Sequence, residues 1–214
     1  MEKDLLSLAD LTPQELKEIL RLTKVIKAKQ KNGEPQEYLK NKTLIMFFEK
    51  PSLRTRVSFE VGMTQLGGHA IYYDVSTGPL GKKESMEDTG KVVSRFCDII
   101  MARLKHFEDT KSLAENSSVP VIDALSDKNH PCQIIGDLFT IQEKRGEDLK
   151  DLTLTYFGDS ENNVTYSLMH GTALMGMKMK VACPDDPKLS PLPEIVEIAK
   201  KDRSQNRRRS GNCP

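Results

Sequence analysis

Several features that many proteins rely on are scarce or missing in this 214-residue chain. Its four cysteines lie far apart and form no C-x-x-C pair, which argues against a zinc site or a disulfide framework and favours a reducing cytosol. No apolar run approaches the ~20 residues of a membrane helix, and the acidic, amphipathic start is unlike a secretory signal. A net charge of +1 gives no general attraction to nucleic acid. We therefore expect a soluble, cytoplasmic protein with no membrane or nucleic-acid partner.

What is present is an alternation of apolar, strand-like runs with helical patterns from Thr43 onward. Such alternation predicts parallel strands joined by right-handed crossovers, with helices packed on both faces of the sheets. A polar stretch at 143–151 reads as a hinge between two such α/β domains. The expected strands are Leu44–Phe48, Ala70–Tyr73, Ile99–Ala102, Val119–Ile122, Leu152–Phe157 and Lys178–Ala182; the expected helices are Arg56–Leu66, Met86–Phe96, Thr110–Glu115, Pro131–Glu143, Val164–Met175 and Pro193–Lys201.

The stretch 43–63 contains the strongest candidate site. An apolar strand breaks at Pro51 and turns into a helix, and a helix start offers unpaired N–H groups and the positive end of the helix dipole. Two hydroxyls and two guanidiniums, those of Ser52, Thr55, Arg54 and Arg56, lie on the same turn, and Arg binds phosphate oxygens in bidentate fashion. A phosphate cradle and an ordinary capped helix with a solvated face explain this spacing about equally well. The stretch is not a Walker loop.

The amino-acid sequence of this stretch resembles the signature of a known protein family. Phe-Glu-Lys-Pro-Ser-Leu-Arg-Thr-Arg-Val-Ser-Phe-Glu, followed by Leu-Gly-Gly-His, is similar to the carbamoyl-phosphate signature of the aspartate and ornithine carbamoyltransferases. That pattern is usually Ser-Thr-Arg-Thr-Arg, so Leu53 replaces one hydroxyl while its backbone N–H remains. The resemblance implies that Ser52, Leu53, Arg54 and Thr55 bind the phosphate of carbamoyl phosphate.

Two further segments match the same family at the ends of predicted strands. Arg103 follows the strand Ile99–Ala102, where spacing alone favours a surface residue, and the resemblance makes it a carbamoyl-phosphate ligand. His130 and Gln133 are three residues apart at a helix start and can face one ligand. The run His-Pro-Cys-Gln resembles the family motif that holds the carbamoyl group, in its ornithine-type form. The implied catalytic residues are Arg54, Arg103 and His130.

Two loops receive roles from the resemblance alone. The segment Gly-Lys-Lys-Glu-Ser at 81–85 is otherwise an ordinary surface loop, and it resembles the loop that reaches a neighbouring subunit's site in a homotrimer, which involves Lys82 or Lys83. The turn at 158–164 resembles the family's Gly-Asp-x-x-Asn-Asn-Val turn. That likeness assigns ornithine contacts to Asn163 and secondarily to Asn162, although an Asx-type turn capping a helix explains the same residues equally well.

The resemblance ends at about Asp202. Family segments that include Asp-x-x-x-Ser-Met-Gly and His-Cys-Leu-Pro do not occur in these 214 residues, and the last residues form a basic stretch. We therefore expect a carbamoyl-phosphate-binding domain at 1–145, the first part of an incomplete ornithine-binding domain at 151–202, and an atypical tail at 203–214. A frame change or a truncated product explains that tail more simply than a basic partner-binding segment does. The part from Leu152 onward is expected to be weakly stable.

The implied reaction is transfer of the carbamoyl group of carbamoyl phosphate to the δ-amine of L-ornithine, giving citrulline and phosphate, with no metal or organic cofactor. We expect little turnover from this chain by itself, because residues of the amine site are missing. Two alternatives stay open. One is a carbamoyltransferase for another amine, such as putrescine or aspartate, and the other is a non-catalytic carbamoyl-phosphate-binding fragment. A citrulline assay separates them.

Overall fold

The computed structural model describes residues 4–78 and 84–210, without the side chains of Thr77 and 202–210. The described residues divide into two compact units. The four-stranded unit comprises residues 4–6 and 22–127, and the two-stranded unit comprises residues 7–21 and 128–210. One boundary falls inside the helix α1 (Pro13–Lys31), which begins with the reciprocal Thr12–Glu15 capping box. α1 is preceded by the short helix η1 (Leu8–Asp10).

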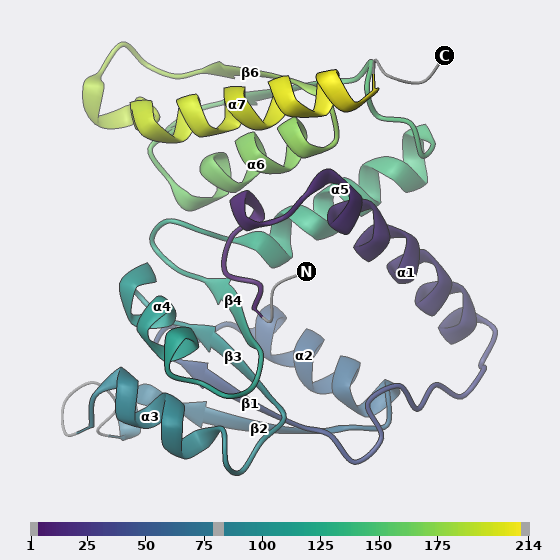
Figure 1. Cartoon of the computed structure of the whole chain (residues 1–214), viewed down its shortest axis with the longest axis vertical. Coiled ribbons are helices and arrows are strands. Elements are labelled where there is room, and N and C mark those ends of the chain that lie inside the picture. Colours follow the sequence, from purple (N-terminus) through teal and green to yellow (C-terminus); the bar gives the residue numbers. More distant parts are fainter. Residues whose placement is uncertain (1–3, 79–83, 211–214) are drawn as a thin grey trace. The chain divides into compact units, whose positions relative to one another are not determined.

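The sheet of the four-stranded unit is entirely parallel and has the order β2-β1-β3-β4 (Figure 1). Its two inner strands are apolar except for Thr43 at the start of β1 and Arg103 at the end of β3, because both faces are covered. The short helix η2 (Val75–Thr77) follows β2. The strands are β1 (Thr43–Phe48), β2 (His69–Asp74), β3 (Ile99–Arg103) and β4 (Val121–Leu125), and the helices between them are α2 (Leu53–Gln65), α3 (Met86–Val93) and α4 (Phe107–Glu115).

Each face of this sheet has its own apolar core. On one face Phe47, Ile100 and Ala102 pack with Leu113 of α4, and α3 lies beside α4. On the other face Met46 and Met101 pack with residues of α2. Because side chains alternate along a strand, residues next to each other in β1 or β3 supply opposite cores. The layers α3/α4, sheet and α2 confirm the predicted α/β architecture with helices on both faces.

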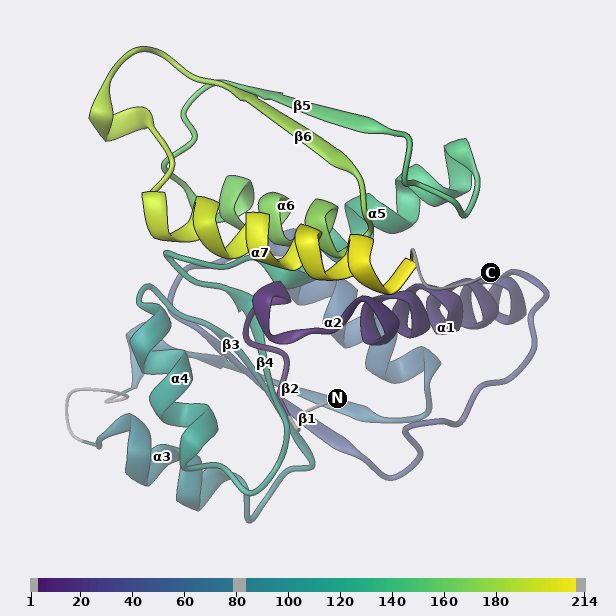
Figure 2. The ribbon, with the colours of Figure 1, turned by 45° about the horizontal axis from the view of Figure 1, so that its top comes forward.

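The two-stranded unit contains the parallel pair β5 (Thr153–Phe157) and β6 (Lys178–Ala182). Figure 2 shows α6 (Asn163–Leu174) and α7 (Pro193–Ser210) on the same side of this pair. The unit also holds α5 (Pro131–Arg145) and the short helix η3 (Pro187–Leu189). α6 is buried all round, whereas alternate side chains of both strands are exposed, and Phe157 is 77% exposed. Only one face of this sheet therefore contributes to the core of the unit.

We expect this difference to appear in amide hydrogen exchange. The amides of β5 and β6 should exchange at least about tenfold faster than those of β1 and β3, because a two-stranded sheet with one exposed face opens at low free-energy cost. Mass spectrometry measures the exchange of both sets of amides in a single sample, so no variant is needed. Protection of 153–157 equal to that of 43–48 would contradict it.

Several element ends differ from the expectation, among them those of α2, β4 and α7. α2 begins at Leu53 instead of Arg56, because Ser52 caps it. β4 begins at Val121 instead of Val119, since Pro120 has no N–H to donate and contributes only its carbonyl, which accepts from Ile100. The backbone of α7 continues to Ser210, so most of the segment described as a tail is helical. No helix in the described ranges is long and apolar enough to cross a membrane.

Candidate functional site

The order of the four strands creates a topological switch point between β1 and β3. β1 leads through α2 to β2 on one side, and β3 leads through α4 to β4 on the other side. In open parallel sheets, ligands bind outside the carboxyl ends of the strands at such a point. The segments that leave these two strand ends are the Pro51 turn and the residues around Arg103. Arg103 pairs with Phe48 in register, so the two segments start side by side.

The turn after β1 forms an N-terminal anion site on α2. Ser52 is the cap: its Oγ accepts from the Thr55 N–H at 3.4 Å, and its carbonyl accepts from the Arg56 N–H at 3.0 Å. Within the described part of the chain, the N–H groups of Leu53 and Arg54 remain as open donors at the positive end of the helix. The Leu53 side chain is 78% exposed. The presence of Leu53 instead of the family's usual Thr therefore leaves the backbone N–H at this position accessible.

Arg103 reaches this helix start from the next strand. Its Nε donates to the Lys50 carbonyl at 3.2 Å, and its Nη1 lies 3.4 Å from Thr55 Oγ1. Burial, and then the positive charge of Arg54, lower the pKa of Arg103, while Asp123 acts in the opposite direction. Two cationic groups held this close are each stabilised by an anion between them. The predicted residues Ser52, Leu53, Arg54, Thr55 and Arg103 are thus brought together in one unit; we call them the phosphate cradle.

The second guanidinium that the spacing placed in the cradle lies elsewhere. Arg56 donates through Nε to Glu60 at 2.9 Å, and its guanidinium stacks 4.0 Å from the centre of the Tyr72 ring. Both contacts hold it on the flank of α2. The prediction that Arg54 and Arg56 act as a pair is therefore wrong for Arg56. Arg103, which is distant in sequence, provides the second guanidinium.

Sequence reasoning missed Asp123, an acidic residue inside the apolar strand β4. Its side chain is fully buried, its Oδ2 accepts from Ser126 Oγ at 2.7 Å, and it pairs with Ala102, the neighbour of Arg103. The register shifts between Ala102 and Arg103, an irregularity of the kind that redirects side chains near ligand sites. Burial raises the pKa of Asp123 to about 7. An acidic residue near the carboxyl end of a buried parallel strand was the signal available in the sequence.

The residues assigned to the carbamoyl group lie at the start of α5 in the two-stranded unit. His130 is the residue before the helix, Pro131 is its first residue, and the His130 N–H donates to Ser167 Oγ at 2.9 Å. Gln133 is exposed and donates through Nε2 to Asp137 at 2.9 Å. Each residue is therefore at the helix start, as the pattern predicted. Gln133 is turned along its own helix toward Asp137.

The turn between β5 and α6 holds the two asparagines. Asn162 caps α6: its Oδ1 accepts from the Thr165 N–H at 3.0 Å, and its Nδ2 donates to the Asp159 carbonyl at 2.6 Å. Gly158 has φ +131°, a conformation that L side chains rarely adopt. Asn163 is the first helical residue and is half-buried. The capping explanation therefore holds for Asn162, whose side-chain amide is already engaged, and Asn163 remains the better candidate for a substrate contact.

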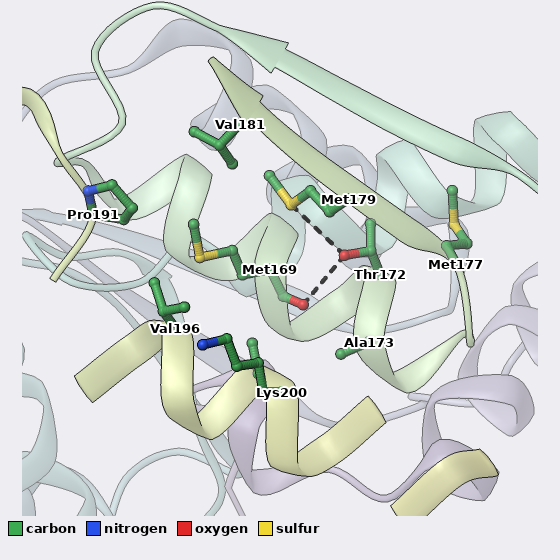
Figure 3. Close-up of a pocket in the computed structure, with 10 residues that line it drawn as sticks. Met169, Thr172, Ala173, Met177, Met179, Val181, Pro191, Val196 and Lys200 are labelled. Atoms are coloured by element: carbon green, nitrogen blue, oxygen red, sulfur yellow. Dashed lines mark hydrogen bonds between the residues drawn. The ribbon is translucent and has the colours of Figure 1, made fainter. Parts of the chain in front are cut away.

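The remaining expectations concern the lysine loop and the absence of a metal site. Lys82 and Lys83 lie outside the described residues. In the described ranges, no three His, Cys, Asp or Glu side chains gather as a metal-binding group. A cavity of about 370 Å³ lies in the two-stranded unit between α6, β6 and α7. Figure 3 shows Met169, Met179 and Val196 among its lining residues. Thr172 Oγ1 donates to the Leu168 carbonyl at 2.7 Å and lies 3.7 Å from Met179 Sδ. Neither asparagine of the turn lines this cavity.

Two models of known protein families match this chain, one in each of its two parts. A model described as the carbamoyl-P binding domain of aspartate/ornithine carbamoyltransferase matches residues 3–143. A second model, described as the Asp/Orn binding domain of the same family, matches residues 150–210.

Individual relatives match most of this chain but only part of their own length. Ornithine carbamoyltransferase from Archaeoglobus fulgidus is 48% identical over 199 residues, which cover 93% of this chain and 64% of that protein. The protein of the same name from Methanosarcina acetivorans is 47% identical over 202 residues, with 94% and 65% covered. The structure of ornithine carbamoyltransferase from Pyrococcus furiosus superposes with a TM-score of 0.91 at 43% identity, covering 95% of this chain and 64% of that one. The chain therefore spans slightly less than two thirds of the length of these relatives.

Proposed function

Because the chain belongs to the aspartate/ornithine carbamoyltransferase family, we propose that its phosphate cradle binds carbamoyl phosphate for carbamoyl transfer to L-ornithine. The observation that carries this proposal is the position of Arg103, whose guanidinium meets Thr55 at the N-terminus of α2. The open N–H groups of Leu53 and Arg54 and two guanidiniums from different strand ends surround one point. A phosphate group with two negative charges suits that arrangement.

The chemistry follows from where charge develops. The δ-amine of ornithine attacks the carbonyl carbon of carbamoyl phosphate, a C–N bond forms, and the bond from that carbon to the phosphate oxygen breaks. The amine loses a proton, and the electron pair of the broken bond leaves with phosphate. Arg54, Thr55 and Arg103 stabilise the charge that gathers on the carbonyl and leaving oxygens. We assign His130 and Gln133 to the carbamoyl group, and the resemblance together with the position of each at the start of α5 supports this role.

The amine substrate is proposed as ornithine. The ornithine-type run from His130 to Gln133 and the names of the relatives support this choice over aspartate or putrescine. Asn163 is the proposed contact to the amino acid, with Asn162 second because its side chain caps α6. The proposed functional division is 1–145 for carbamoyl phosphate, 151–202 for ornithine and 203–214 as a separate tail, and the two family matches at 3–143 and 150–210 support it.

We also propose that the chain assembles as a homotrimer in the cytoplasm, with Lys82 or Lys83 acting at a neighbouring subunit's site. The exposed apolar side chains of Leu53, Val57 and Val61 recur at i, i+4 and i+8 on α2 and support a protein contact on that helix. Light scattering of the purified chain gives the mass of the assembly directly. A monomer at micromolar concentration would contradict the trimer.

The test of the function combines calorimetric titration with carbamoyl phosphate and a citrulline assay with ornithine. We expect saturable binding of one carbamoyl phosphate per chain, with a Kd no weaker than about 1 mM. Turnover would show that the amine site is complete in the assembly. Binding without turnover would favour the second candidate, a non-catalytic carbamoyl-phosphate-binding module. Absence of binding by a folded chain would refute the assignment of the cradle.

A further inference from the structure

Among the described residues of the four-stranded unit, Asp123 is a fully buried titratable group to which the proposed reaction gives no role, and it pairs with Ala102, the neighbour of Arg103. Three contacts define its position. Ser126 Oγ donates to Oδ2 at 2.7 Å, the Leu125 N–H donates to the carboxylate, and the backbone pairs with Ala102. Ser126 is itself fully buried. A charged carboxylate in such surroundings requires a nearby positive charge or a proton.

The charged groups around Asp123 act in opposite directions on its ionised form. Arg103 of β3 attracts its negative charge, and Asp127 in the following loop repels it. Arg54 in turn repels Arg103. Other ionisable groups at this end of the sheet include Lys105, which pairs with Glu49 at 3.5 Å, and His106, which lies 3.5 Å from Asp127. Asp4 accepts from the Val121 N–H at the opposite end of β4. Because burial is the largest influence, the pKa of Asp123 is raised to about 7 and the group is partly protonated at neutral pH.

We propose that Asp123 is a positioning residue of the phosphate cradle, whose buried carboxyl group takes up a proton when a dianion binds beside Arg103 and whose charge sets the affinity for that anion. The inference rests on the proposed function, because it requires the cradle to hold phosphate. The ionised carboxylate competes with the ligand for the positive charge of Arg103. The protonated form leaves that charge to the ligand and keeps its bond with Ser126.

The physical link is a thermodynamic cycle. A bound dianion neutralises the guanidinium that stabilises the Asp123 carboxylate and adds negative charge to the neighbourhood, so the proton affinity of Asp123 rises. By the same cycle, the anion binds more tightly to the protonated protein than to the ionised one. Anion binding should therefore weaken as the pH rises through neutrality. That dependence belongs to the protein and not to the ligand.

Sulfate is the probe that isolates this effect, because it stays a dianion between pH 6 and pH 8 whereas phosphate esters titrate there. Calorimetry at pH 7 in PIPES and in imidazole, two buffers with different ionisation enthalpies, measures the protons bound per sulfate. We expect an uptake of about 0.3 proton in the unaltered chain and a sulfate affinity about threefold weaker at pH 8 than at pH 6. Asp123→Asn should abolish the uptake and remove the pH dependence. His106→Gln is the matched control and should retain both, because it removes the side chain beside Asp127 and leaves the Asp123 carboxyl in place.

The outcomes separate the inference from the function. Sulfate or carbamoyl phosphate binding without proton uptake overturns the role of Asp123 and leaves the cradle intact. Uptake that persists in Asp123→Asn assigns the proton to another group and also overturns the role. Absence of any anion binding refutes the cradle and the inference with it. If Asp123→Asn does not fold, the uptake in the unaltered chain still decides, since it must be largest near pH 7 and vanish by about pH 9.

Discussion

Replacing Arg103 with alanine should weaken carbamoyl-phosphate binding by about 30-fold or more, the equivalent of ~2 kcal/mol for a lost charge-assisted contact. The same loss is expected for Arg54→Ala, because Arg54 lies at the start of α2 and its positive charge acts on Arg103, so a bound anion stabilises both groups. Calorimetric titration of each variant with carbamoyl phosphate measures the loss. Arg103→Lys should recover only part of the affinity, since an ammonium cannot contact Lys50 and Thr55 with the fork geometry of Arg103.

Arg56→Ala is the matched control for this pair. Arg56 directly follows the cradle residue Thr55 in sequence, yet its side chain forms an ion pair with Glu60 and stacks on the Tyr72 ring. Its removal should leave carbamoyl-phosphate affinity within about twofold while costing up to ~1 kcal/mol of stability from the lost stacking. A loss of affinity in Arg56→Ala equal to that in Arg54→Ala would mean that general positive charge, and not the cradle geometry, attracts the ligand.

Asp123→Asn should stabilise the four-stranded unit at alkaline pH and have little effect in acid. The pKa of Asp123 is raised from 3.8 to about 7 in the folded chain. Between these values the folded state holds a proton that the unfolded state has lost, so stability falls as the pH rises from about 4 to 7 and the full penalty is present above pH 7. The penalty amounts to about 4 kcal/mol at most. We expect a net gain of about 2 kcal/mol at pH 8, because the new amide N–H must also be buried.

Urea unfolding followed by circular dichroism at pH 5 and pH 8 measures this gain. The asparagine oxygen can still accept from Ser126, so the local structure is preserved. Asp127→Asn is the control: this carboxylate is partly exposed and caps the Phe107 N–H, which an amide oxygen also does. It should keep most of the pH dependence, because burial and not the charge of Asp127 is the largest cause of the raised pKa of Asp123. A gain in Asp123→Asn that is equal at both pH values would show that Asp123 is already ionised or already neutral throughout the range.

Local sequence patterns predicted the elements of the fold well. β6 has the predicted bounds, β1, β2 and β3 differ from the prediction by one or two residues, and the α/β architecture of the four-stranded unit is as expected. These successes share a physical cause, since alternation, apolar runs and caps are written in neighbouring residues. The predicted end of the last helix at Lys201 was too early, because the polar residues that follow carry no signal that stops a helix.

The candidate site was only partly visible in the sequence. Ser52, Leu53, Arg54 and Thr55 could be grouped because they are contiguous, and the resemblance added Arg103. The direction of Arg56 could not be predicted, because its partner Tyr72 is in another strand. Asp123 was missed because the predicted strand ended at Ile122, which left this acidic residue in the following loop, whereas β4 continues to Leu125.

Local sequence patterns located most strands and helices to within about three residues and identified the turn that presents donors to an anion, and the motifs indicated the family. The tertiary structure decided which charges meet. Placing β1 between β2 and β3 creates the switch point at which Arg103 joins the start of α2, and pairing β3 with β4 buries Asp123 next to them. Both outcomes depend on strand order and register, which are set by long-range packing of two apolar faces and cannot be read from any local segment.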